Sequence, residues 1–176
     1  MSFSVEQLID RHWDRLLPFN AARFASLLGY QVEGFSGTVG STDVCGYAKA
    51  SQGQKVIGYN QDEHVNRQRF TIAHELAHHL LGHVGAEGFL LDTPVHFSSS
   101  VSNDIEAEAN AVALQLLMPQ NAVRLLIERC GVTSAIDLAN AFQVSEAAMV
   151  QRLRDMKLIR EHVFVEERPS ESKFTR

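Results

Sequence analysis

The sequence predicts an α+β fold in which a small antiparallel sheet packs against one long helix and the C-terminal half is mainly helical. Between Val32 and Tyr59 the chain is rich in glycine, serine, threonine and β-branched residues, which is typical of short strands joined by tight turns. After residue 62, apolar residues recur every three or four positions, as in helices that bury one face. A sheet of few strands leaves an apolar face that these helices must cover.

Length and composition fit one folded unit. The 176 residues are 45% hydrophobic and 21% charged, and the net charge of -5 argues against a surface built mainly to bind nucleic acid. No apolar run approaches the roughly 18 residues of a membrane span, and the first residues lack the pattern of a signal peptide. Cys45 and Cys130 lie far apart, which favours free thiols. We therefore expect a cytoplasmic protein with one domain over 1–165 and a polar tail over 166–176.

Two short helices are expected before the strands. Apolar residues at helical spacing favour a first helix over 4–17, which Pro18 ends. A second helix over 21–28 would end at Gly29. The expected strands lie around Gly37–Val39, Val44–Lys49 and Lys55–Tyr59, with a hairpin turn at Ser51–Gln54.

A long helix is predicted next. It begins at a cap formed by Asp62 or Asn66, runs to Leu81 and ends at Gly82. Residues 83–102 contain glycine, proline and a serine cluster, and predict a loop. The remaining helices are expected from an Asn103 or Asp104 cap to Met118, and over 120–129, 134–142 and 146–157.

Residues 74–78, His-Glu-Leu-Ala-His, are the most informative segment of the chain. Positions four apart share one face of a helix, about 5–6 Å apart at Cβ, so His74 and His78 could hold one zinc ion. Glu75 lies about 100° further round the helix, where its carboxylate reaches a metal-bound water without displacing it. The neighbouring residues are apolar, so the helix is predicted to be buried, and one metal ion would satisfy all three polar side chains. The pattern indicates a metal-assisted hydrolase.

Two nearby histidines are expected not to bind the metal. His79 is one position off the face that His74 and His78 share. His83 lies beyond Gly82, where the helix should end.

A third ligand is expected from the helix that begins near residue 104, where Glu106 and Glu108 are the candidates. Glu106 is favoured because the residues on its face are small and apolar, and so suited to packing on the first metal-binding helix. Asn110, four residues after Glu106, could form a hydrogen bond with the ring nitrogen of a ligating histidine that does not bind the metal.

Three blocks of the sequence, in order, resemble the ImmA/IrrE metallopeptidases. They are residues 67–81, which include the metal motif, Glu106 to Asn110, and Leu-Leu-Met-Pro at 116–119. The resemblance covers most of residues 30–155 and implies a zincin-like fold, with zinc held by His74, His78 and Glu106 and with Glu75 catalytic. The chain departs from the family at Ala77, where glycine is usual, and at Val112-Ala113, where Phe-Ala is frequent.

The sequence thus predicts a zinc metallopeptidase domain over 1–165 that cleaves a specific protein. The resemblance suggests a helix-turn-helix repressor as the substrate. One alternative has the same chemistry but a different biological role: the protein would be the toxin-like component of a toxin–antitoxin or mobile-element pair. A second alternative belongs to another functional class: a non-catalytic zinc domain that binds a protein partner or DNA. The presence of Glu75 disfavours it.

Residues 132–160 are predicted to form a helical subdomain with helix-turn-helix spacing. Several of its side chains could face DNA: Gln151, Arg152, Arg154 and Lys157. Glu146 and Asp155 lie on the same short helix and the whole chain is acidic, so packing or partner docking is favoured over direct DNA binding. Arg67 and Arg69, before the metal motif, are expected to pair with carboxylates and brace the fold.

Overall fold

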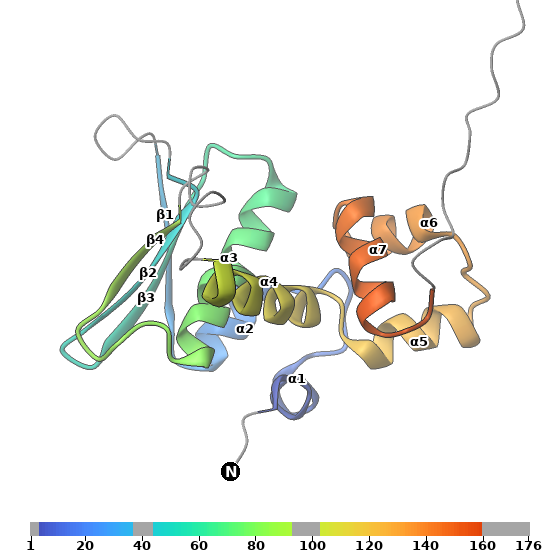
Figure 1. Cartoon of the computed structure of the whole chain (residues 1–176), viewed down its shortest axis with the longest axis horizontal. Helices are drawn as coiled ribbons and strands as arrows, with labels where there is room; N and C mark the ends of the chain where they lie inside the picture. The colour runs from blue at the N-terminus through green and yellow to red at the C-terminus, as the bar shows by residue number, and fades with distance from the viewer. Residues whose placement is uncertain (1–3, 37–43, 93–102, 160–176) are drawn as a thin grey trace, which may run out of the picture.

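A computed structural model describes residues 4–36, 44–92 and 103–159 and confirms the α+β prediction (Figure 1). In Figure 1 the sheet lies at one end of the molecule, α5 to α7 lie at the other, and α3 and α4 lie between them. The elements, in chain order, are α1 (Val5–His12), α2 (Ala21–Leu27), β1 (Gln31–Phe35), β2 (Gly46–Ser51), β3 (Gln54–Asn60), α3 (Val65–Leu81), β4 (Phe89–Asp92), α4 (Asn103–Leu117), α5 (Gln120–Glu128), α6 (Ala135–Phe142) and α7 (Glu146–Asp155).

The sheet has four strands in the order β1-β3-β2-β4, and it is mixed. β2 pairs antiparallel with both β3 and β4, whereas β1 pairs parallel with β3, so the prediction of an antiparallel sheet is wrong for β1. The sequence does not predict β1, and it predicts a loop over 83–102, where β4 forms. Both are edge strands with little full burial, so neither shows the alternation that marks a half-buried strand. The strand expected around Gly37–Val39 lies outside the described residues.

The hairpin between β2 and β3 has the turn that the sequence predicts. Gln52 and Gly53 both adopt positive φ, of 52° and 78°. Two such residues in succession form the two-residue turn whose twist matches the flanking strands.

Helix ends follow local capping. α1 ends at His12 rather than at residue 17, because the chain becomes extended at Trp13. α3 is capped by His64, whose Nδ1 accepts a hydrogen bond from the backbone of Asn66, so neither predicted cap is the one used. Gly82 adopts the left-handed conformation with φ of 78° and ends α3 as predicted.

α3 forms the centre of the molecule, between the sheet and α4. Every residue from Thr71 to His79 is buried, as expected for a helix covered on both sides. The sheet contributes Ala48 and Ile57 to the core, and α4 contributes Ala109 and Ala113, all fully buried. Small side chains on α4 allow the two helices to pack closely. Within the described residues, no helix is long and apolar enough to span a membrane.

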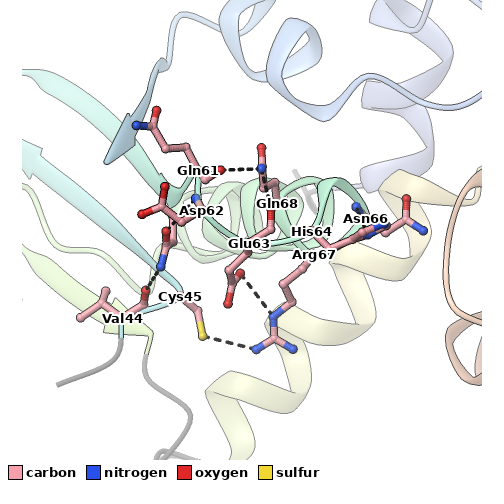
Figure 2. Close-up of polar contacts among 10 residues, drawn as sticks. Val44, Cys45, Gln61, Asp62, Glu63, His64, Asn66, Arg67 and Gln68 are labelled. Carbon is pink, nitrogen blue, oxygen red and sulfur yellow. Dashed lines mark hydrogen bonds and ion pairs between the residues drawn. The ribbon is translucent and has the colours of Figure 1, made fainter. Parts of the chain in front are cut away.

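Two arginine side chains, Arg67 and Arg152, make contacts that connect different elements of the fold. Arg67 pairs with Glu63 at 3.7 Å, as expected, and also donates to the Cys45 sulfur at 3.3 Å (Figure 2). Arg152 is buried and donates to the Met118 carbonyl, so it does not face solvent as a DNA contact would require. Cys45 and Cys130 are both free thiols.

Arg69 pairs with backbone carbonyls rather than with a carboxylate, which corrects the prediction. It donates to the carbonyls of Phe19, Phe142 and Gln143 at 2.9, 3.1 and 2.6 Å. It therefore joins α3 both to the segment before α2 and to the end of α6.

Replacing Arg69 by methionine is expected to lower the free energy of unfolding by about 3 kcal/mol. Hydrogen bonds from a charged donor contribute about 1.5–3 kcal/mol each, but these three are at most partly buried, so water replaces part of the lost donation and the total stays near the value of one or two such bonds. Urea titration would measure the loss. The exposed Arg154→Met is the matched control and should change stability by less than about 0.5 kcal/mol. Equal stability of the two variants would contradict the bracing role.

Candidate metal centre

Two histidines on α3 present their imidazoles to α4. His74 and His78 are one turn apart and are 3% and 2% exposed. Their Nε2 atoms lie 3.0 Å from each other. Burial and the neighbouring His74 lower the pKa of His78 to about 4, so its imidazole is neutral near pH 7, the form that binds metals.

Glu106 on α4 completes a group of three donors. Its Oε2 lies 3.1 Å from His74 Nε2, and its Oε1 lies 3.5 Å from His78 Nε2. In a tetrahedral zinc site with bonds of about 2.0–2.1 Å, neighbouring donors are about 3.3–3.4 Å apart. The three donor separations bracket that value, so these residues could hold one divalent ion such as zinc. The structure thus brings together His74, His78 and Glu106.

The two ring nitrogens of His74 have different surroundings. Nε2 lies within 3.1 Å of both Glu106 Oε2 and His78 Nε2. Nδ1 is shielded from solvent and, among the described residues, has no hydrogen-bond partner. The ring is therefore oriented by its Nε2 contacts, and Nε2 is the atom that it presents to the donor group.

Glu75 lies beside the three donors with its carboxylate inside the protein. The side chain is 1% exposed, and its Oε1 makes no hydrogen bond within the described part of the chain. Burial raises the pKa of Glu75 well above its usual value, and the charges of Asp92 and Glu106 raise it further. A carboxyl group in this setting can take up and release a proton.

Close packing of β2 on α3 holds Glu75 in place. A Cβ atom at Gly46 would lie 2.3 Å from Thr71 Cγ2 and 2.9 Å from Glu75 Oε1. A larger residue at this position of β2 would therefore have to displace the Thr71 and Glu75 side chains.

Asp92, at the end of β4, is a member of the site that the sequence did not reveal. One of its carboxylate oxygens, one of Glu75 and a ring nitrogen of His74 all lie within 4.8 Å of one another. The residue falls in the segment predicted to be a loop, so no sequence signal connected it with the motif.

His83 and Glu108 form a chain of contacts behind His78. The turn at Gly82 brings His83 back, so that its Nδ1 lies 3.0 Å from His78 Nδ1, and its Nε2 lies 3.3 Å from Glu108 Oε2. If His78 binds a metal through Nε2, its Nδ1 carries the proton and donates to His83. His83 then donates through Nε2 to Glu108. Such a chain fixes the orientation and tautomer of the ligand.

His79 and Asn110 are not part of the group of three donors. His79 Nε2 lies 3.0 Å from the Val56 carbonyl, on the sheet side of α3, consistent with its expected role as a non-ligand. Asn110 lines a cavity one turn along α4 from Glu106. Among the described residues it makes no hydrogen bond to either histidine, so the support behind His78 comes from His83 instead.

Replacing His83 by alanine is expected to weaken zinc binding by about 10–100-fold, the usual cost of removing a hydrogen-bond partner behind a metal ligand. Competition with a chromophoric chelator would measure the zinc Kd. The matched control is His12→Ala, which changes a histidine on α1, outside the donor group. An unchanged Kd in the His83 variant would show that His78 is held in place without it.

Comparison with known proteins agrees with this geometry. The profile of the IrrE N-terminal-like domain, a peptidase family, matches residues 27–154. The radiation response metalloprotease IrrE of Deinococcus radiodurans is 31% identical over 103 residues, which are 57% of this chain and 31% of that protein. The chain thus spans about a third of the length of this curated relative. The residues that match the family profile include α3 and α4 and therefore all three donors.

Proposed function

Because the chain belongs to the ImmA/IrrE family of metallopeptidases, which carry the IrrE N-terminal-like domain, we propose that it is a zinc-dependent endopeptidase that cleaves a specific protein. The observation that carries the proposal is the convergence of the donor atoms of His74, His78 and Glu106, with Glu75 buried beside them. A metal-binding domain without catalysis has no need of a buried carboxylate at this position.

The residues divide the chemistry between them. His74, His78 and Glu106 would hold the zinc ion, which when bound lowers the pKa of a water molecule and polarises the carbonyl of the scissile peptide bond. Glu75 would take the proton of the attacking water and pass it to the leaving amine. Asp92 lies beside Glu75, and its charge adds to the effect of burial in raising the pKa of that carboxyl, which favours uptake of the proton.

We propose a helix-turn-helix transcriptional repressor as the substrate, the class that the family resemblance suggests. A toxin-like role in a toxin–antitoxin or mobile-element pair would use the same chemistry. We further propose that residues 1–165 form one domain, in which the helices of 132–160 serve packing or docking of a protein rather than DNA. Arg152 supports this assignment, since its side chain is buried against Met118.

Incubation of the zinc-loaded protein with any helix-turn-helix repressor encoded beside its gene would test the proposal. We expect specific fragments by mass spectrometry, and no fragments when 1,10-phenanthroline is present. Metal analysis of the purified protein would identify the ion. An intact repressor with the zinc-loaded protein would contradict the repressor as substrate, and cleavage that persists with chelator would contradict the metallopeptidase mechanism.

A further inference from the structure

We propose that a cavity next to the metal centre selects the substrate by binding an apolar side chain beside the scissile bond. This inference rests on the proposed function and adds the chemistry of the preferred substrate. The cavity has a volume of about 560 Å³, within the range of sites that bind small molecules or side chains. It lies between the first turns of α3, the second half of α4 and the start of α7.

The cavity begins one helical turn from the donor residues, which do not themselves line it. Phe70 lines it one turn before His74, and the two rings stack with centroids 6.1 Å apart. Asn110 lines it one turn after Glu106 on the facing helix. One helical turn advances about 5.4 Å, whereas an extended peptide advances about 3.3–3.6 Å per residue. A peptide whose scissile carbonyl lies at the donors would therefore reach the cavity with one of its first two side chains on that side of the bond.

The lining favours an apolar side chain. Most of the wall is hydrocarbon, from Phe70, Leu114, Leu117, Val144 and Ala148. None of the described residues that line the cavity is acidic, so a lysine or arginine side chain would find no counter-charge there.

The basic residue at the rim does not create an acidic preference. Arg67 lines the cavity, but its guanidinium is directed to Glu63 and to the Cys45 sulfur (Figure 2). An acidic substrate side chain would have to compete with Glu63 for it. Leucine, methionine and phenylalanine are therefore the expected occupants.

Two measurements test the cavity. In the first, the zinc-loaded protein cleaves a proteome-derived peptide library, and mass spectrometry reads the residues around each cleaved bond. In the second, calorimetry compares leucine hydroxamate with glycine hydroxamate, which share a zinc-binding group and differ in the side chain. We expect leucine, methionine and phenylalanine to be enriched at one position beside the bond. Leucine hydroxamate should bind at least about tenfold more tightly than glycine hydroxamate, as for alkyl groups in apolar pockets.

A pair of variants links these preferences to the cavity. Ala148 lines it, and Ala147, the preceding residue of α7, is exposed and does not. Ala148→Phe should fill the space, move the peptide preference to glycine and alanine, and bring the hydroxamate ratio close to one. Ala147→Phe introduces the same side chain on the same helix and should keep both wild-type preferences.

The outcomes separate the two proposals. A protein that neither cleaves peptides nor binds either hydroxamate when loaded with zinc would contradict the proposed function. Cleavage without an apolar preference, or a preference that Ala148→Phe leaves unchanged, would overturn the cavity assignment alone. A wild-type dimer in sedimentation that Ala148→Phe dissociates would also overturn it, because a second copy would then occupy the cavity. The hydroxamate comparison on the unmodified protein needs no variant, so the test holds even if Ala148→Phe does not fold.

Discussion

Replacing Glu75 by glutamine is expected to lower kcat/KM for peptide cleavage by about 10²–10⁴-fold while the protein keeps its zinc. Glutamine has the same shape but cannot take up a proton, and general base catalysis contributes about this factor. Glu75 is not among the three donors formed by His74, His78 and Glu106, so the metal site stays intact. The measurement is a continuous assay with a fluorogenic peptide from the cleaved protein, together with zinc analysis of the variant.

The control for Glu75→Gln is Glu128→Gln, the same substitution on α5, where the side chain pairs with Arg124. It should keep wild-type kcat/KM. Full activity of Glu75→Gln would remove Glu75 from the mechanism. Loss of zinc from that variant would instead identify Glu75 as a ligand.

Removal of the Glu106 carboxylate is expected to have the largest effect on metal binding. Glu106→Ala takes away one of three protein donors and should weaken zinc binding by more than the 10–100-fold typical of residues behind the ligands. Activity should fall with zinc occupancy. Chelator competition gives the Kd, and circular dichroism shows whether the helices remain.

Glu108→Ala is the matched comparison because the same residue type is removed half a turn away. Glu108 contacts His83 rather than the donors, and its side chain is 65% exposed. We expect a zinc Kd weakened by no more than about 10-fold, the low end of the range for residues behind a ligand. If Glu108→Ala loses zinc and Glu106→Ala retains it, the third ligand is Glu108 and the donor geometry described above is wrong.

The parts of this fold that local chemistry dictates were predictable from the sequence. The hairpin turn follows from the left-handed preference around Gly53, and the end of α3 follows from Gly82. The placement of the motif on a buried helix follows from the apolar residues around it. The small, apolar residues on the same face of α4 as Glu106 are buried as predicted, with Ala109 and Ala113 both fully buried.

The parts that depend on tertiary pairing were not predictable. β1 and β4 are short edge strands whose sequences lack alternation, and β1 becomes a strand through parallel pairing with β3. Asp92 joins the site only because β4 pairs with β2. His83 follows the end of α3 in the sequence, which predicts no contact with the site, yet the chain reversal at Gly82 brings it to within 3.0 Å of His78.

Under the proposed function, the division of the donors between α3 and α4 would make zinc supply a determinant of how long the folded protein survives. An ion held by both helices would bind the folded chain in preference to the unfolded chain, because unfolding separates His74 and His78 from Glu106. At free zinc of 100 times the Kd, such binding stabilises the fold by about 2.7 kcal/mol. Zinc starvation would thus remove activity and also populate opened states that cellular proteases degrade, so that abundance would follow metal availability.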